Sequence, residues 1–445
     1  MSLKFRRVLL GLGAGVLLVA GVVAWQPGSE YQQANAATDY GQLQKFSRVM
    51  EMVRRAYVEK VGDEKLIEGA LSGMLSSLDP HSTYLDKEMY KQMTVDTKGE
   101  FGGLGIEISA AEGGIRIVSP IEDTPADRAG VKAGDLIIKI DDQLARDISL
   151  PEGVKLMRGK PGTSIVLTIF REGENQPLEI KIVRAVIKVK SVKSDMLAPG
   201  YAYLRITQFQ ERTGELLKAQ IKDLKKRSGG SLSGAVLDLR NNPGGLLNQA
   251  VEVSDMFLEK GNIVSTKSRA GKSLTFDARP GDELAALPLI VLINNGSASA
   301  SEIVAGALQD HHRAVLLGTK SFGKGSVQSV IPLQDGTAIK VTTALYYTPS
   351  GRSIQATGID PDIQVEQVVN KPDEQAKSKI PLVSERDLKG HLSNGNKKSK
   401  SKKDAAKDEA NSADASEAMQ KRLPMDTQLQ RALDLLRGLH ALKAG

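Results

Sequence analysis

The sequence predicts a multidomain α/β protein with a helical N-terminal region, a small β-rich module, a larger α/β core and a C-terminal helix. Its 445 residues are too many for a single hydrophobic core. Short β-branched runs punctuated by glycine fill residues 99–186, and continuous apolar runs alternate with helical segments over residues 189–369. Such alternation of strand and helix is typical of a largely parallel sheet covered by helices.

The composition is that of a soluble globular protein. Apolar residues make up 40% of the chain and charged residues 25%, and the net charge is +7. Much of the positive charge lies near the N-terminus and in a lysine-rich run near the C-terminus. Aromatic residues make up only 4%, with no basic stripe between rings, so we expect no nucleic-acid partner. Because cysteine is absent, thiol catalysis, cysteine zinc sites, disulfides and a lipoprotein anchor are excluded.

Residues 1–36 have the layout of a secretory signal peptide. Basic residues at positions 4, 6 and 7 precede an uncharged apolar run over 8–25, and the small-x-small triplet Ala34-Asn35-Ala36 follows. We therefore expect cleavage after about Ala36 and export to a bacterial periplasm. The alternative is an uncleaved leader that anchors the protein to the inner membrane, because the run approaches the roughly 20 residues of a spanning helix.

Residues 37–95 are predicted to form a helical region with two helices joined near Gly62-Asp63. Apolar residues recur here at helical spacing, among them Leu43, Phe46, Met50, Val53 and Tyr57. This apolar stripe packs either on a partner subunit or within its own domain.

Residues 96–186 are predicted to form a compact β-rich module of ordinary small-domain size. The β-branched runs at 115–118, 136–140 and 165–170 predict strands. A short helix is expected at Thr124–Ala129, because a capping threonine is followed by proline at the first helical position.

Residues 187–385 are predicted to form the α/β core. The apolar runs Ala235–Leu239 and Leu289–Ile293 are typical of strands buried on both faces. Each run precedes a glycine-containing loop and then a helical segment, at 246–258 and 301–310. Ligands of open α/β sheets bind beyond the carboxyl ends of the strands, so these two loops are the first candidate sites.

The C-terminal part divides into a linker and a helix. Residues 386–420 are rich in Lys, Ser, Asn, Asp and Ala and predict a flexible linker. Residues 421–445 predict an amphipathic helix, with leucines at helical spacing at Leu429, Leu433, Leu436 and Leu439. Because a lone helix of this length is marginal in water, we expect it to dock, most economically on another subunit.

The segment 294–302 supplies a candidate nucleophile. Ser299 follows an apolar strand and begins a helix, where free backbone amides and the helix dipole favour an oxyanion. The string from Ser299 to Glu302 is also a capping box, which merely starts a helix. On this segment alone the structural interpretation is favoured.

A serine nucleophile needs a base. His311 and His312 lie at the far end of the same predicted helix, about 15 Å from its start. His81 stands in a predicted helix-ending turn and is not excluded. Lys324 is the alternative, because apolar neighbours lower the pKa of an amine and let it accept a proton near neutral pH. Gln328 is placed to hold this amine by a hydrogen bond.

Two further motifs bear on the assignment. Ser321 and Lys324 match the Ser-x-x-Lys motif of penicillin-binding enzymes, but a glycine beside the lysine opposes the helix that this motif needs. The partner motifs Ser-Asp-Asn and Lys-Thr-Gly are absent, so we reject that assignment. The loop Asp238–Gly245 exposes glycine amides after a buried strand, and these amides either complete an oxyanion hole or simply make the turn.

Three segments together resemble the C-terminal processing peptidases, also called tail-specific proteases. They are residues 238–245, 297–302 and 321–328. The family's order of helical N-terminus, PDZ domain and crotonase-like α/β protease core corresponds to residues 38–369. The resemblance implies that Ser299 is the nucleophile, Lys324 the base and Gln328 the residue that orients it. It also implies an oxyanion hole from the amides of Ala300 and Gly245, with no cofactor and no metal ion.

The β-rich module resembles the PDZ domain of this family. The resemblance implies that Gly103-Leu104-Gly105-Ile106 receives the carboxylate of a protein tail on backbone amides, while the peptide adds a strand to the sheet edge. It also implies a regulatory role for Arg158, which would report the position of the PDZ domain to the active site. The alternative for Arg158 is a solvated charge in a turn.

The expected function is that of an exported serine endopeptidase that binds protein C-terminal tails and hydrolyses peptide bonds through an acyl-enzyme. The main alternative is a catalytically inactive PDZ adaptor, against which the complete set of Ser299, Lys324 and Gln328 argues. A histidine-dependent hydrolase would require His81 in the site. Expected partners are proteins or peptides with accessible C-termini, further copies in a homo-oligomer and an activating adaptor protein. Membrane association is expected only if the leader is retained.

Overall fold

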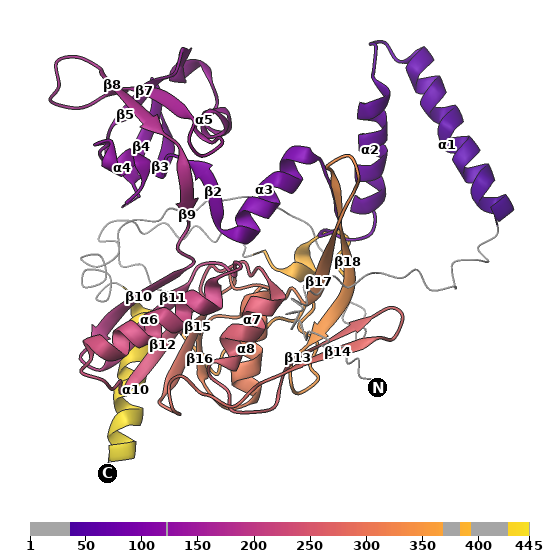
Figure 1. Cartoon of the computed structure of the whole chain (residues 1–445). Helices are drawn as coiled ribbons and strands as arrows, with labels where there is room; N and C mark the ends of the chain where they lie inside the picture. Colours follow the sequence, from indigo (N-terminus) through magenta and orange to yellow (C-terminus); the bar gives the residue numbers. More distant parts are fainter. Residues whose placement is uncertain (1–35, 122, 368–382, 393–425, 445) are drawn as a thin grey trace, which may run out of the picture. The chain divides into compact units, whose positions relative to one another are not determined.

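The computed structural model describes residues 36–121, 123–367, 383–392 and 426–444 (Figure 1). The chain divides into two compact units, Met1–Ala70 and Leu71–Gly445. The predicted signal peptide, apart from Ala36, and most of the predicted linker lie outside the described residues. In the part of the chain that is described, no helix combines the length and the hydropathy needed to cross a bilayer.

Two helices make up the described part of the first unit, and the second of them continues into the next unit. α1 (Ala36–Ala56) and α2 (Asp63–Ser76) are joined at the predicted place, and Arg54 forms an ion pair with Asp63 at 3.2 Å. The predicted apolar stripe of α1 is largely exposed, with 63% of Leu43 and 42% of Phe46 accessible to solvent.

α3 (Lys87–Lys98) precedes the β-rich module and is capped at both ends. The Asp86 carboxylate accepts the Met89 N–H at 2.7 Å, which satisfies a free amide of the first turn. Gly99 ends the helix with φ 69°, a left-handed conformation that glycine adopts without strain.

The module is an antiparallel sheet of order β3-β4-β5-β7-β8, with β6 paired to β5 and a separate β2-β9 pair. Its apolar core includes Ile117, Ile137 and Leu167, which are fully buried. The predicted strands and the predicted short helix lie within this module. Its elements are β2 (Glu100–Gly103), β3 (Ile106–Ala111), β4 (Gly114–Pro120), α4 (Pro125–Arg128), β5 (Leu136–Ile140), β6 (Gln143–Leu144), a 3₁₀ turn (Ala145–Asp147), α5 (Leu150–Met157), β7 (Ser164–Phe170), β8 (Leu178–Val183) and β9 (Ala185–Lys188).

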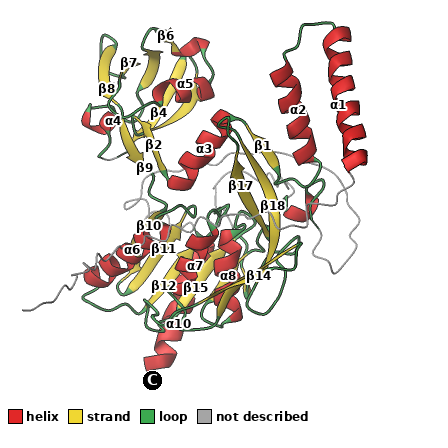
Figure 2. Cartoon of the chain, turned by 45° about the vertical axis from the view of Figure 1, so that its right-hand side comes forward, coloured by secondary structure: helices red, strands yellow, loops and turns green. Residues whose placement is uncertain are grey.

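The core is built on a six-stranded sheet of order β10-β11-β12-β15-β16-β19, parallel from β11 onward. Every residue of β12 and β15 is buried, because helices cover both faces of the sheet (Figure 2). The elements are β10 (Val192–Ala198), β11 (Tyr201–Ile206), α6 (Thr213–Arg227), β12 (Gly234–Asp238), α7 (Leu247–Asp255), β15 (Leu289–Ile293), α8 (Ala300–Asp310), β16 (Val315–Gly318), β19 (Ile363–Gln364) and α10 (Thr427–Ala444).

The two faces of this sheet receive different helices. Leu237 and Val291 face the core shared with α6, α7 and α8. Their neighbours along the strands, including Val236, point the other way and pack against α10 through Leu433 and Leu436. The prediction that the C-terminal helix docks on another subunit is therefore wrong for this structure, because its apolar face is covered by its own chain.

A second, antiparallel sheet has the order β1-β18-β13-β14, with β17 paired to β18. β17 and β18 form the long hairpin that follows the loop carrying Lys324. The elements are β1 (Thr83–Leu85), β13 (Asn262–Ser268), β14 (Ser273–Asp277), β17 (Ser326–Pro332) and β18 (Ala338–Tyr347). The predicted multidomain α/β architecture is confirmed.

Candidate active site

Ser299 lies at the junction between β15 and α8. Its backbone has φ 56° and ψ −115°, a conformation that is rare for residues with a side chain. The nine residues from Ala300 to Leu308 are all buried, so packing of the helix in the core fixes the turn. The strained turn places the Ser299 hydroxyl at a helix N-terminus, as the sequence predicted, where the partial positive charge favours anions.

Glu302 joins the Ser299 turn to the loop that carries Lys324. Its carboxylate, which is fully buried, accepts the backbone N–H groups of Ser299 at 2.8 Å and Lys324 at 2.9 Å. It also accepts the Ser321 hydroxyl at 2.6 Å and the Gly323 N–H at 2.8 Å. Burial raises the pKa of Glu302 to about 7, although these hydrogen bonds act to lower it. Sequence reasoning recognised Glu302 only as the end of a capping box.

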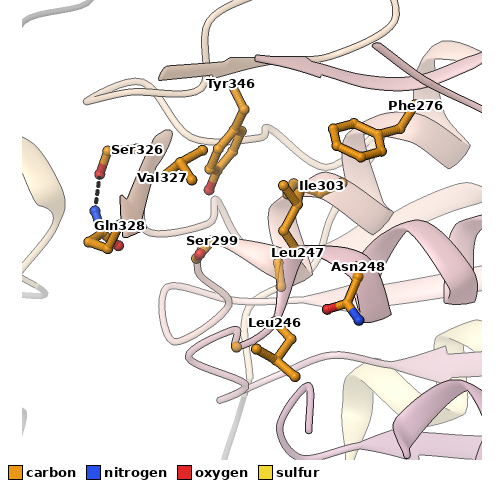
Figure 3. A pocket seen from close by; sticks show the side chains of 12 residues that line it. Leu246, Leu247, Asn248, Phe276, Ser299, Ile303, Ser326, Val327, Gln328 and Tyr346 are labelled. Carbon is orange, nitrogen blue, oxygen red and sulfur yellow. Dashed lines mark hydrogen bonds between the residues drawn. The ribbon is translucent and has the colours of Figure 1, made fainter. Parts of the chain in front are cut away.

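Lys324 is half-buried on the loop between β16 and β17. Burial lowers the pKa of its amine, and the nearby charge of Lys340 lowers it further. The Tyr346 hydroxyl donates to the Lys324 carbonyl oxygen and points toward Ser299 (Figure 3). Within the described residues, no hydrogen bond joins Lys324 Nζ to Ser299 Oγ.

Ser299 opens into a pocket of about 450 Å³ (Figure 3). Gly245, Ala300 and Gln328 line the same pocket, so four of the five predicted catalytic residues lie together. Gln328 Nε2 donates to Ser326 Oγ at 2.9 Å rather than to the lysine amine. The remaining lining is mostly apolar, contributed by Leu246, Leu247, Phe276, Ile303, Val327 and Tyr346.

The glycine loop after β12 lies directly against the Ser299 turn. A Cβ atom on Gly244, whose φ is 100°, would lie 2.8 Å from Ser299 Cβ and 2.9 Å from the Ala300 nitrogen, so only glycine fits. The Asn242 carbonyl fastens the loop by accepting the Ala298 N–H at 3.0 Å and the Ser301 hydroxyl at 2.9 Å. These contacts bring the backbone of residues 244–245 beside the amide of Ala300.

His81 lies outside this pocket. Its Nε2 contacts both carboxylate oxygens of the buried Glu385, at 2.8 and 2.9 Å. Glu385 also accepts Gln355 Nε2 at 2.9 Å, and Gln355 in turn accepts the Gly325 N–H at 2.8 Å. His81 therefore supports the loop that carries Lys324, and nothing in its contacts supports a role as the base.

The segment 383–392 also corrects the predicted linker. Glu385 N–H donates to the Phe322 carbonyl at 3.1 Å, and a 3₁₀ turn follows at Glu385–Asp387. Leu388 N–H donates back to the Glu385 carbonyl at 3.1 Å. Residues 386–392, the first part of the predicted linker, therefore follow this turn against the loop of Phe322, and the rest of the predicted linker lies outside the described residues.

The predicted carboxylate loop of the β-rich module borders a cavity of about 160 Å³. β3 is an edge strand of the module's sheet, so its outer side is available for a further strand. Arg158 is half-buried beside this cavity, with its guanidinium carbon 4.7 Å from the centre of the Phe101 ring, and it donates to Gln92 of α3. It is therefore not a freely solvated charge. The cavity is lined by Phe101, Gly103, Leu104, Gly105, Ile106, Ile108, Val154, Met157 and Arg158.

Among the described residues, no group of three or more His, Asp or Glu side chains is arranged to hold a metal ion. Ser299 and the backbone of Gly245 and Ala300 line the pocket, whereas Lys324 is not among its lining residues and is joined to Ser299 through the buried carboxylate of Glu302.

Family models match three parts of the chain. Peptidase family S41 matches residues 200–365, a PDZ domain matches 102–182, and the N-terminal domain of the activating protease CtpB matches 22–89.

Curated relatives extend the match over nearly the whole sequence. A carboxy-terminal-processing protease of Bartonella bacilliformis is 50% identical over 428 residues, which cover 96% of this chain and 94% of the relative. The carboxy-terminal processing proteases CtpA and CtpB of Bacillus subtilis are 37% and 36% identical, covering 75% of this chain and 71% and 70% of their own lengths. The chain therefore belongs to the carboxy-terminal processing proteases, serine-type peptidases of family S41 that carry a PDZ domain.

Proposed function

We propose that this protein is an exported endopeptidase that cleaves protein substrates through an acyl-enzyme on Ser299, with Lys324 as the general base. The observation that carries the proposal is the shared carboxylate of Glu302, which ties the backbone of Ser299 to that of Lys324 within one hydrogen-bonded unit. Burial lowers the pKa of the Lys324 amine, which favours the neutral form that a general base needs.

The reaction follows from these positions. The neutral amine of Lys324 accepts the proton of Ser299 Oγ as the oxygen attacks a peptide carbonyl. The backbone amides of Gly245 and Ala300 stabilise the resulting oxyanion. The ammonium of Lys324 then protonates the leaving amine, and the regenerated amine activates the water that hydrolyses the ester. Because Nζ and Oγ share no hydrogen bond in this structure, we expect the flexible lysine side chain to swing toward Ser299 when substrate binds.

We propose that the cavity beside Gly103–Ile106 binds the C-terminal tail of the substrate. Its apolar lining suits an apolar terminal side chain, and the open edge of β3 suits an added strand. The tail would hold the substrate while a peptide bond elsewhere in it is cleaved.

The test is cleavage of an unstructured protein with an apolar C-terminus by the full mature chain. Wild-type protein should cleave it and should be labelled on Ser299 by a fluorophosphonate, as located by mass spectrometry. Ser299→Ala should do neither, whereas the exposed Ser273→Ala serves as the matched control and should behave as wild type. Cleavage by Ser299→Ala at the wild-type rate would disprove the assignment. Tail binding without cleavage by the wild type would instead favour the adaptor function.

A further inference from the structure

The start of α10 contacts the catalytic glycine loop through a buried arginine. Arg240, only 4% of whose side chain is exposed, lies between the end of β12 and that loop. Its Nη1 and Nη2 donate to the two carboxylate oxygens of Asp426 at 2.9 and 2.8 Å. Nη1 also donates to Gln428 Oε1 at 2.9 Å. Such paired hydrogen bonds between a guanidinium and a carboxylate fix orientation as well as distance.

The other side of Arg240 is held by the end of β12. Its Nε and Nη2 donate to Asp238 at 2.9 and 2.7 Å, and the Tyr203 hydroxyl donates to the same carboxylate at 2.7 Å. Burial acts to raise the pKa of Asp238, but the charge and hydrogen bonds of Arg240 outweigh it and lower this pKa to about 2. The two carboxylates thus clamp one arginine from opposite elements of the core.

The residues after Arg240 pass this restraint to the nucleophile. Asn241 N–H donates to Asn294 Oδ1 at 2.9 Å, and Asn294 Nδ2 donates back to Asn241 Oδ1 at 2.7 Å. The next residue, Asn242, accepts the Ala298 N–H, one residue before Ser299. A short chain of contacts therefore runs from Asp426 through Arg240 to both sides of the proposed oxyanion hole.

We propose that Asp426 is a positioning residue for the reaction. By holding Arg240, it keeps residues 241–245 in the geometry in which the Gly245 amide faces the oxyanion. This inference rests on the proposed function. Its consequence is that the C-terminal helix contributes to the rate of the chemical step as well as to the stability of the sheet that it covers.

The test is Asp426→Asn in the full mature chain. Asparagine retains the capacity to cap α10 through the Leu429 N–H, which Asp426 accepts at 3.0 Å, but it removes the charge that Arg240 faces. We expect kcat to fall about tenfold with KM within about twofold of wild type, because misplacement of a catalytic amide affects the transition state more than the bound substrate. The rate of fluorophosphonate labelling should fall in parallel.

Two controls separate positioning from stability. Asp282→Asn makes the same chemical change in another buried pair, in which Arg313 Nε lies 2.9 Å from Asp282. Leu436→Ala loosens the packing of α10 without touching Arg240. Both should lower the melting temperature while leaving kcat at the wild-type value. If Asp426→Asn does not fold, Gln428→Ala removes the neutral acceptor instead and should lower kcat about two- to threefold.

The outcomes distinguish this inference from the proposed function. Loss of cleavage in Ser299→Ala but an unchanged kcat in Asp426→Asn would overturn only the role of Asp426. An equal fall of kcat in Leu436→Ala would also overturn it, because docking of the helix and not the carboxylate would then matter. If Asp426→Asn does not fold and Gln428→Ala is measured in its place, an unchanged kcat in Gln428→Ala would overturn the role of Asp426. Full activity of Ser299→Ala would overturn the proposed function itself.

Discussion

The pocket at Ser299 and the cavity of the PDZ module are stabilised in different ways. The pocket depends on polar cross-links, since one buried carboxylate, Glu302, holds the backbones of two loops. The cavity of the PDZ module depends on backbone shape, since a glycine loop borders apolar side chains. We therefore expect the pocket to be sensitive to loss of a polar atom and the cavity to be sensitive to added volume.

The largest effect is expected for Lys324→Ala. Removal of the proposed base should lower kcat by at least about 10³-fold, as does removal of members of known catalytic triads. Because burial lowers the pKa of this amine, the folded state disfavours its charged form, and the melting temperature should stay at or above that of wild type.

The matched control for Lys324→Ala lies in the same loop. Lys320 forms an exposed ion pair with Asp360 at 2.9 Å, and Lys320→Ala should retain wild-type kcat. If Lys324→Ala cleaves substrate as fast as Lys320→Ala does, the pocket does not use this amine.

Glu302→Gln comes next in expected effect. A glutamine amide has only one acceptor oxygen, and its NH₂ group donates where the second carboxylate oxygen accepts. Some of the groups that donate to Glu302 in the wild type therefore lose their partner in the variant. We expect kcat to fall about 10²-fold through displacement of the two loops. Steady-state kinetics and thermal melting would measure both consequences.

The PDZ module offers a control with the same chemical change. Glu152 completes the capping box of α5 but is exposed, and it accepts the Ser149 N–H at 2.8 Å. Glu152→Gln should change kcat less than about twofold, because exposed caps contribute only to local helix stability. Equal effects of the two substitutions would show that Glu302 is only a helix cap.

Gly105→Ala tests the cavity. Gly105 has φ 79°, and an added Cβ would collide with the Thr124 side chain that packs against the loop. We expect affinity for an apolar tail peptide to fall about tenfold, while hydrolysis of a short peptide without a tail-binding segment keeps its kcat. Fluorescence anisotropy of a labelled tail peptide would measure the affinity.

Gly113→Ala separates collision from backbone strain. Gly113 lies in the same module with φ 82°, but a Cβ there would meet nothing within 4 Å. It should destabilise the module by about 1 kcal/mol without weakening tail binding. If both substitutions weaken binding equally, the glycine loop is not the site of the tail.

The smallest effect concerns pH. Below about 7, the pKa of Glu302, its carboxyl is protonated and accepts fewer N–H groups. We therefore expect kcat/KM to rise severalfold as pH increases through about 7, and the part of the rise due to Glu302 should vanish in Glu302→Gln.

Stability should respond to Glu302 in the opposite direction. The folded state keeps this proton up to about pH 7, whereas the unfolded chain releases it near the ordinary value of 4.5. The contribution of Glu302 to stability is therefore complete below pH 4.5 and is lost as pH rises toward 7. Denaturant unfolding of the wild type and of Glu302→Gln across this range would measure the difference, and parallel profiles would contradict it.

The features that depend on residues close together in the sequence could be predicted from the sequence. The buried strand Leu289–Ile293 and the helix start at Ser299 follow from a continuous apolar run and local capping residues. The link from Glu302 to Lys324 could not be predicted, because its partners are 19 to 22 positions away on a loop with no periodic pattern. The contact between Arg240 and Asp426 spans 186 positions and depends on how the final helix crosses the sheet.

The strained backbone of Ser299 predicts which residue would replace it in a relative that no longer cleaves protein. Its φ and ψ angles match the first central position of a type II′ turn, which glycine occupies without strain. Glycine at this position would relieve the backbone strain, and in a chain freed from catalysis selection for cleavage would no longer oppose the exchange. Glycine at this position in a relative would therefore identify a protein that retains the architecture but has given up hydrolysis.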